Sequence, residues 1–207
     1  MYRHIQRSSL PLAMAAFLSL SLTALGPRSA SAAVDPCSDP NRPPTIVGSG
    51  SINGTGGDDV IHGSDGPDVI DGGGGNDLIC GFDGDDVISG GSGNDLAFGG
   101  LGSDSVSGGS GNDFVSGNGE PIVDDASDTV NGGSGDDGLG ASSGISRLNG
   151  DSGNDSLTSG SPDAISDGGS GSDSCHVDEG LDPSTGVPPS GTGSVTSCEE
   201  ITSGALG

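Results

Sequence analysis

The stretch Gly54-Thr-Gly-Gly-Asp-Asp-Val-Ile-His62 decides the fold, because it opens seven consecutive copies of a nine-residue repeat that end at Ser116. The next two copies read Gly63-Ser-Asp-Gly-Pro-Asp-Val-Ile-Asp71 and Gly72-Gly-Gly-Gly-Asn-Asp-Leu-Ile-Cys80. Numbered as nine columns, every copy has glycine in column four, aspartate in column six and an apolar residue in column eight. A strict short period of this kind is typical of a solenoid, in which each repeat stacks on its neighbours.

The nine columns have distinct physical roles. Glycines in columns one to four permit positive φ angles and let main-chain carbonyl groups approach a ligand closely. Columns seven to nine are expected to form a short strand whose column-eight side chain points inward. Two repeats complete one coil, so turns 18 residues apart stack along the same edge. Each column-six aspartate then lies beside a row of carbonyl oxygens, and hard oxygen ligands of this kind suit Ca²⁺.

Two runs within the array carry a family resemblance. Gly72-Gly-Gly-Gly-Asn-Asp-Leu-Ile and Gly90-Gly-Ser-Gly-Asn-Asp-Leu-Ala resemble the RTX, or hemolysin-type, calcium-binding repeat family, and the resemblance extends over residues 54–176. It implies an all-β parallel β-roll, a two-sheet β-solenoid with calcium in the turns and column-six aspartates as ligands. Many family members carry a C-terminal export signal and a large toxin, protease or lipase domain, whereas for this chain we expect an N-terminal signal and no such domain.

We predict that about five to seven Ca²⁺ ions bind between stacked column-six carboxylates. The unbroken block supplies five stacked pairs. The second block supplies Asp137 with Asp155 and, if its small insertions and deletions cancel, Asp155 with Asp173. Ser146 replaces one aspartate and is expected to weaken its site. The predicted ligands are Asp59, Asp68, Asp77, Asp86, Asp95, Asp104, Asp113, Asp128, Asp137, Asp155, Asp163 and Asp173.

Calcium binding and folding are expected to be one event. Each repeat buries about one apolar side chain, which cannot offset the conformational entropy lost when nine residues are ordered. Metal binding must supply the difference, as it does for other sites that are absent from the unfolded state. Acid that protonates the aspartates is expected to release the metal and unfold the chain together.

The sequence around the array predicts the domain organisation. Arg3 and Arg7, an apolar stretch over residues 10–25 and Ala30-Ser31-Ala32 form a secretory signal peptide, so a secreted, extracellular protein without membrane insertion is expected. The predicted segments are the signal peptide (1–33), an N-terminal cap with a degenerate repeat (34–53), a first repeat block (54–117), a loop (118–126), a second, less regular block (127–176) and a C-terminal cap or tail (177–207).

Charge excludes one class of partner. Beyond the signal peptide, only Arg42 and Arg147 stand against 30 acidic residues, which gives a formal charge of −28, and the chain contains no lysine. Nucleic-acid binding requires a positively charged surface and is therefore excluded. A glycine-rich, acidic composition with few aromatic residues is by itself typical of disorder. The strict period favours a folded array instead, provided that a cation neutralises the charge.

Four cysteines in a secreted chain favour two disulfides, for which three connectivities are possible. Zinc ligation is disfavoured because no two cysteines lie two to four residues apart. Cys37 and Cys198 lie outside the array, whereas Cys80 and Cys175 lie within it. We predict the pairs Cys37–Cys80 and Cys175–Cys198, each tying an irregular cap to the array, with free thiols as the alternative.

One outer face is predicted to be apolar, with Val60, Leu78, Leu96, Phe98 and Phe114 around Cys80. Apolar faces of this size are usually covered or used for binding. We expect residues 37–49, including Ile46 and Val47, to fold across this face, and self-association through it is the alternative.

The leading functional hypothesis is a stand-alone, secreted, non-catalytic calcium-binding protein. A cell-surface structural or adhesive module stiffened by calcium is the alternative. Catalysis is disfavoured because a two-layer roll with one inward side chain per repeat leaves no pocket for a substrate. His62 and His176 occupy column nine, an outward position, and are expected to be surface residues rather than catalytic bases.

Overall fold

The computed structural model describes the repeat array and parts of both caps. The described residues are 36–118, 126–141, 144–161, 163–177, 194–196, 198 and 200–203. The predicted signal peptide lies outside this set, as do residues 119–125 of the predicted loop and most of the predicted tail. The domain boundaries drawn from the sequence stay predictions.

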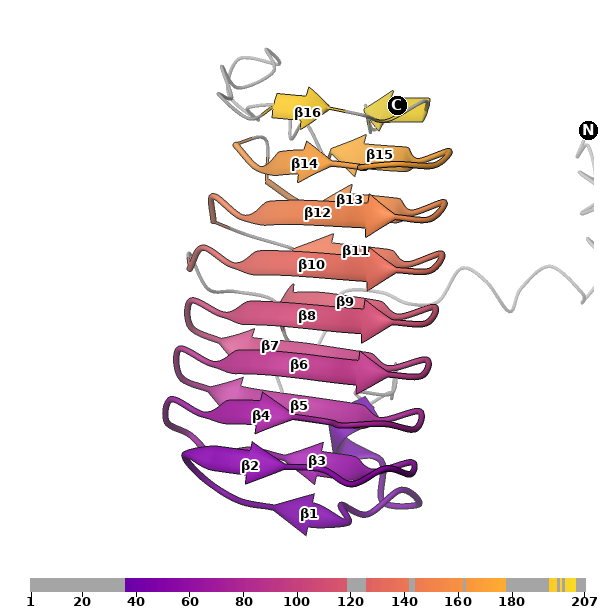
Figure 1. Cartoon of the computed structure of the whole chain (residues 1–207). Coiled ribbons are helices and arrows are strands. Elements are labelled where there is room, and N and C mark those ends of the chain that lie inside the picture. The colour runs from indigo at the N-terminus through magenta and orange to yellow at the C-terminus, as the bar shows by residue number, and fades with distance from the viewer. Residues whose placement is uncertain are drawn as a thin grey trace, which may run out of the picture. The chain divides into compact units, whose positions relative to one another are not determined.

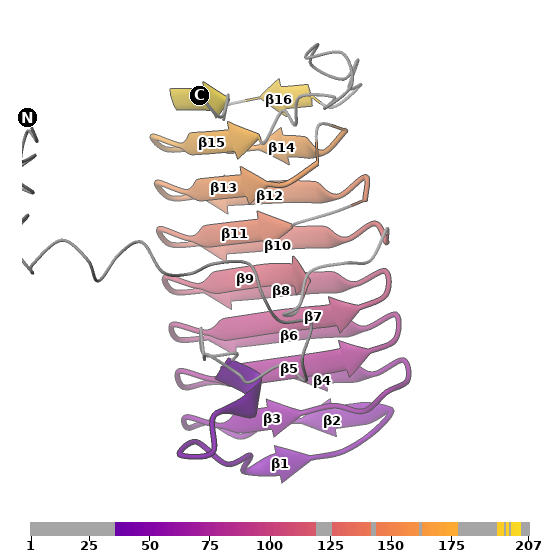
Figure 2. The ribbon, with the colours of Figure 1, turned by 180° about the vertical axis from the view of Figure 1, so that it is seen from behind.

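The described strands form two parallel sheets that lie face to face, and the chain passes from one to the other at each turn (Figure 1, Figure 2). The odd sheet contains β1 (Ile46–Val47), β3 (Val60–His62), β5 (Leu78–Asp83), β7 (Leu96–Leu101), β9 (Phe114–Asn118), β11 (Gly138–Ala141), β13 (Ser156–Ser159), β15 (Ser174–Val177) and β17 (Glu200–Ser203). The even sheet contains β2 (Ser51–Asn53), β4 (Val69–Asp71), β6 (Val87–Ser92), β8 (Ser105–Ser110), β10 (Thr129–Ser134), β12 (Arg147–Ser152), β14 (Ile165–Asp167) and β16 (Ser194–Thr196).

The described residues contain one helical element, the 3-10 helix η1 (Pro36–Ser38), which lies against β5. No helix in this part of the chain has the length and apolar character needed to cross a membrane.

Neighbouring strands within a sheet are one coil apart. Val69 of β4 pairs with Val87 of β6, a step of 18 residues. The step becomes 24 residues between Val106 of β8 and Val130 of β10, and it returns to 18 between Val130 and Leu148. The predicted all-β parallel two-sheet solenoid is confirmed, and six extra residues are absorbed in one turn without loss of register.

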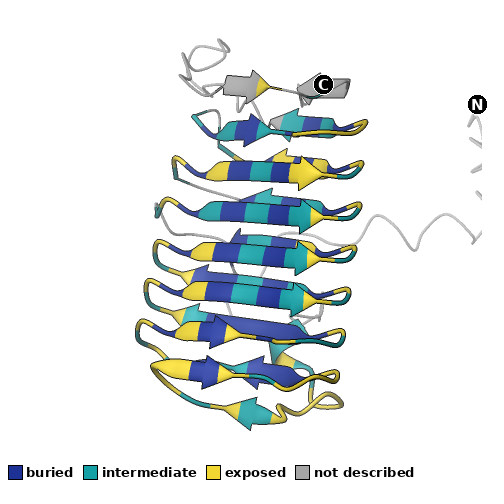
Figure 3. Ribbon diagram, in the orientation of Figure 1, coloured by how far each residue is buried: buried dark blue, intermediate teal, exposed yellow. Residues whose placement is uncertain are grey.

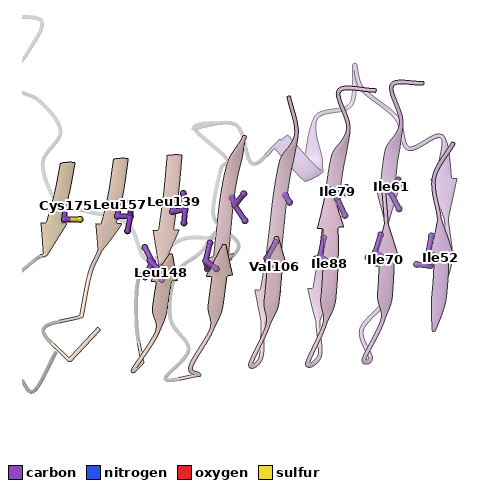
Figure 4. Packing of buried hydrophobic residues seen from close by; sticks show 14 residues of the cluster. Ile52, Ile61, Ile70, Ile79, Ile88, Val106, Leu139, Leu148, Leu157 and Cys175 are labelled. Atoms are coloured by element: carbon purple, nitrogen blue, oxygen red, sulfur yellow. The ribbon is translucent and has the colours of Figure 1, made fainter. Parts of the chain in front are cut away.

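Column eight forms the core between the sheets (Figure 3, Figure 4). Ile61 and Ile79 project from the odd sheet, and Ile70 and Ile88 project from the even sheet. The cluster consists of Ile52, Ile61, Ile70, Ile79, Ile88, Ala97, Val106, Val115, Val130, Leu139, Ala141, Leu148, Leu157 and Cys175. The buried hydroxyl residue Ser166 takes the column-eight position of β14.

Several strands are longer than the predicted three residues. β5, β6, β7, β8, β10 and β12 each contain six residues and continue through column three of the following repeat. The glycines there lie close enough to the neighbouring coil to join the ladder, as Gly91 does with Gly109. Gly91 has a φ of 110° and a methyl group on it would meet the carbonyl oxygen of Gly73, so only glycine fits this close approach.

Both predicted disulfides are present. Cys37–Cys80 ties η1 to the outer face of β5, and Cys175–Cys198 ties the C-terminal cap to the inward side of β15. The Cα atoms are 6.0 Å apart in each bridge. The predicted tail also contributes β16 and β17, which add a strand to the end of each sheet.

The prediction that Ile46 and Val47 fold across the apolar outer face is wrong. These residues form β1, which pairs edge to edge with β3 and leaves Val47 69% exposed. Val60, Leu78 and Cys80 are buried, and Cys37 packs against them, so this end of the face is covered. Farther along the same sheet, Leu96 and Phe98 are half-buried and Phe114 is exposed.

Candidate metal centre

The column-six residues form two rows, one on each edge of the solenoid. The first edge holds the turns that lead from the even sheet into the odd sheet, with Asp59, Asp77, Asp95, Asp113, Asp137, Asp155 and Asp173. The second edge holds the returning turns, with Gly50, Asp68, Asp86, Asp104, Asp128, Ser146 and Ala164. All eleven of these aspartates are buried.

One carboxylate oxygen of each turn ties that turn to the coil before it. The backbone N–H of Asp77 donates to Oδ1 of Asp95 over 2.8 Å, and the N–H of Asp86 donates to Oδ1 of Asp104 over 2.8 Å. The pattern continues across the 24-residue step, where the N–H of Asp113 donates to Oδ1 of Asp137 over 2.7 Å. The rows are therefore continuous ladders of carboxylates with a fixed orientation.

The second carboxylate oxygen has no such partner in much of the array. Oδ2 is buried and accepts no hydrogen bond in Asp77, Asp86, Asp95, Asp113, Asp137 and Asp155. Buried polar atoms in proteins almost always have a partner, and a charged atom without one carries a large desolvation cost. A row of such oxygens therefore calls for a proton or a cation.

Main-chain carbonyl oxygens face the same space as these carboxylate oxygens. A methyl group on Gly90, in column one, would lie 2.5 Å from Oδ2 of Asp95 and 2.5 Å from the carbonyl oxygen of Gly108 in the next coil. At Gly132 the corresponding distances are 2.5 Å to Oδ2 of Asp137 and 2.9 Å to the carbonyl oxygen of Gly150. Column one must be glycine because a side chain would fill the space that these two oxygens share.

Burial also changes the acidity of these groups. Desolvation raises the pKa of Asp77, Asp86, Asp113 and Asp155 to about 6, although a backbone N–H bond partly opposes the shift in each of them. Desolvation raises the pKa of Asp95 and Asp137 as well. Nearby acidic residues add to the effect, since Asp137 and Asp95 both raise the pKa of Asp113. The metal-free turns thus disfavour the negative charge that a bound cation would stabilise.

The donor set fits a hard divalent cation. Carboxylate and carbonyl oxygens are the ligands of Ca²⁺, which accepts six to eight of them in flexible geometry. The described residues contain no group of three or more His, Cys, Asp or Glu side chains arranged to hold a metal, so most ligands of such a site would be main-chain oxygens. This arrangement explains why glycine, rather than further acidic residues, dominates the turns.

A comparison with protein-family models matches the RTX calcium-binding nonapeptide repeat in four copies, over residues 53–81, 81–115, 123–139 and 140–161. The chain is an RTX-type repeat protein. Neither the curated proteins nor the solved structures contain a match to it. The RTX repeat accounts for the two features that the fold alone leaves unexplained, namely the buried aspartate rows and the glycines beside them.

One predicted ligand of the RTX array is misplaced. Asp163 was assigned to column six, but Ile165 pairs with column-seven Arg147, so Ala164 occupies column six and Asp163 occupies column five. Leu157 and Cys175 are paired at a step of 18 residues, so this coil contains no net insertion or deletion. Ser146 does occupy column six, and its hydroxyl oxygen replaces a carboxylate in the ladder by accepting the N–H of Asp128 over 3.2 Å.

The structure also stacks two aspartate pairs that the sequence could not place. Asp104 with Asp128 and Asp113 with Asp137 are joined by hydrogen bonds across the inserted residues. The first edge therefore carries aspartate in every coil from Asp59 to Asp173, whereas the second edge loses its aspartates after Asp128.

A second ladder in column five was not foreseen. On the first edge, the N–H of Asn94 donates to Oδ1 of Asn76 over 2.8 Å, and the N–H of Asn112 donates to Oδ1 of Asn94 over 2.7 Å. Here the later coil donates to the earlier one, which is the reverse of column six. The signal in the sequence was the recurrence of Asn and Asp in column five of alternate repeats.

Proposed function

We propose that this RTX-type protein is a secreted, non-catalytic calcium-binding protein that folds as Ca²⁺ ions fill the stacked turns. The observation that carries the proposal is the row of buried Oδ2 atoms that accept no hydrogen bond and face a carbonyl oxygen of the next coil. The family match to calcium-binding repeats supports the identity of the ion.

The proposed side-chain ligands are the buried column-six aspartates from Asp77 onward. They are Asp77, Asp86, Asp95, Asp104, Asp113, Asp128, Asp137, Asp155 and Asp173. Between coils, each carboxylate would supply Oδ2 to an ion while Oδ1 keeps its hydrogen bond to the neighbouring coil. Asp163 is not among them because it does not lie in column six.

Secretion and the absence of catalysis are parts of the same proposal. The N-terminal sequence features of a signal peptide and the two disulfides both suit an oxidising extracellular environment. Extracellular calcium is abundant enough to load modules that bind it at roughly 10⁻⁴–10⁻³ M. Edman sequencing of protein collected from the culture medium would test whether the mature chain begins near residue 33.

Far-UV circular dichroism of the mature protein during Ca²⁺ titration tests the proposal, with Mg²⁺ as the ion control. We expect a cooperative gain of β-structure with Ca²⁺ that Mg²⁺ does not reproduce, because Mg²⁺ requires a stricter octahedral geometry and keeps its waters. A chain that is equally folded in chelator and in Ca²⁺, and that binds no ion in equilibrium dialysis, would contradict the proposal.

Adjacent residues provide a matched pair of variants. Asp86→Asn alters a buried carboxylate in the second-edge row, whereas Asp85→Asn alters an exposed neighbour whose Oδ1 only accepts the N–H of Ser103. We expect Asp86→Asn to reduce the number of bound ions and Asp85→Asn to leave it unchanged. Asp137→Asn and Asp136→Asn form the equivalent pair on the first edge.

A further inference from the structure

In Asp59 and Asp68 the second carboxylate oxygen accepts hydrogen bonds, unlike Oδ2 of Asp77, Asp86, Asp95, Asp113, Asp137 and Asp155. Oδ2 of Asp59 accepts both the backbone N–H and the hydroxyl of Thr55, each over 2.8 Å. Oδ2 of Asp68 accepts hydrogen bonds from the backbone N–H of Ser64 over 2.7 Å and from its hydroxyl over 3.0 Å. These are the earliest column-six aspartates of the first and second edges, at the N-terminal end of the array.

The difference arises in column two. Thr55 and Ser64 occupy that column in the turns of Asp59 and Asp68 and lie outside the positive-φ region. Later turns place residues with positive φ there, at Gly73, Phe82, Gly91, Gly100, Gly109, Gly133, Asp151 and Gly169. The N–H of Gly73, for example, donates to Oδ1 of Asp71 rather than to the column-six carboxylate of its own turn.

Packing around the column-four glycines shows the same division. A methyl group on Gly66, in column four, would meet no atom within 4 Å, but one on Gly93 would collide with the carbonyl oxygen of Gly75. The first turn of each row therefore has a looser backbone and does not need the tight packing that later turns require.

We propose that turns 54–59 and 63–68 are metal-independent cap turns, in which the hydroxyl and N–H of Thr55 and Ser64 take the place of a calcium ion. Calcium loading then begins at turns 72–77 and 81–86. This inference rests on the proposed function and narrows it, because it removes Asp59 and Asp68 from the ligands expected from the sequence.

The arrangement has a physical purpose. The coil that precedes these two turns contacts them through Gly50 and Thr45, whose N–H and hydroxyl groups donate to Oδ1 of Asp68 and Asp59, and not through a column-six carboxylate. A metal ion between that coil and either turn would therefore have fewer carboxylate ligands than an ion farther along the array. Both donor groups of Thr55 reach Oδ2 of Asp59, so this oxygen has hydrogen-bond partners without a metal ion. Cys37 of the Cys37–Cys80 bridge packs against the buried cluster that contains Val60, the residue after Asp59. A preformed end of this kind gives the first calcium-binding turns a surface on which to stack.

Counting bound Ca²⁺ by equilibrium dialysis of the full mature chain tests the proposal. Asp59→Asn and Asp68→Asn are compared with Asp77→Asn and Asp86→Asn, which change the next aspartate of each row. We expect the first two variants to bind as many ions as the unaltered protein and the last two to lose at least one ion each. Loss of an ion in Asp59→Asn or Asp68→Asn would overturn the inference.

A second variant removes only the hydroxyl groups. Thr55→Val with Ser64→Ala should leave the ion count unchanged but accelerate amide hydrogen exchange of β3 and β4 in chelator by roughly tenfold or more, since hydrogen bonds to a charged group are lost. Unchanged exchange in these strands would also overturn the inference. An unaltered protein that binds no Ca²⁺ would instead contradict the proposed function itself.

Discussion

A buried carboxylate oxygen without a donor forces a choice between a proton and a metal ion at each turn. The folded-state pKa of Asp77, Asp86, Asp113 and Asp155 is about 6, above the ordinary value of 3.8. A raised carboxyl pKa means that the protonated form is favoured by the metal-free fold. The stability that these four carboxyl groups add to the metal-free fold is fully present below about pH 4 and is lost as the pH rises through about 6.

The metal-free protein should therefore become more stable on acidification. In calcium-free buffer we expect the far-UV circular dichroism signal of β-structure to increase between pH 7.5 and pH 4.5. In excess Ca²⁺ the same pH change should release ions, because protons compete for the same oxygens. The sequence predicts that acid releases the metal and unfolds the chain together, and the same measurement tests that expectation. A signal of β-structure that falls with acid in calcium-free buffer would contradict the present prediction.

Within a strand, side chains alternate between the core and the outer face, and this decides which of them stabilise the fold. In β4, Ile70 is 1% exposed in the core, whereas the adjacent Val69 is 56% exposed on the outer face. We expect Ile70→Ala to lower the free energy of unfolding in saturating Ca²⁺ by roughly 2–5 kcal/mol. Val69→Ala should change it by no more than about 0.5 kcal/mol. Denaturant titration of both variants measures the difference, and equal effects would mean that column eight does not form the core.

The strands also show which structural features the sequence pattern predicts and which it does not. The period placed column eight inward because alternation is a property of every extended chain. It did not predict the longer strands, since glycine has no strand preference and joins these ladders only because the neighbouring coil is so close. Nor did it place Asp163 correctly, because Asp-Ala-Ile imitates columns six to eight, whereas backbone pairing puts buried Ser166 opposite Leu148.

At the scale of the whole array, the two bridges hold the ends. Cys37–Cys80 closes a loop with a sequence separation of 43 residues, and Cys175–Cys198 closes one of 23. Loop-closure entropy alone gives contributions of about 4 and about 3 kcal/mol, respectively. We expect reductant to lower the thermal midpoint in Ca²⁺ and to increase hydrogen exchange first in β3 and β15, next to the bridges. A midpoint that does not change after complete reduction would argue against this role.

The bridges could be predicted because each joins a cysteine outside the array to one inside it. The hydrogen bonds to Oδ2 of Asp59 and Asp68 could not be predicted, although the sequence shows Thr55 and Ser64 in column two. A hydroxyl residue there does not reveal its backbone angle or the oxygen that it contacts. The aspartate rows could be predicted from the period, whereas the contacts of the second oxygen of each carboxylate depend on the backbone conformation of the folded turn.

The regular coil step has a mechanical consequence. If the array is pulled from its ends, coils between Cys80 and Cys175 can detach one at a time, and each 18-residue coil releases about 60 Å of chain. The single 24-residue coil between Val106 and Val130 releases about 80 Å. A force–extension trace would thus show evenly spaced unfolding steps with one longer step. Bound calcium would set the force at which each coil detaches.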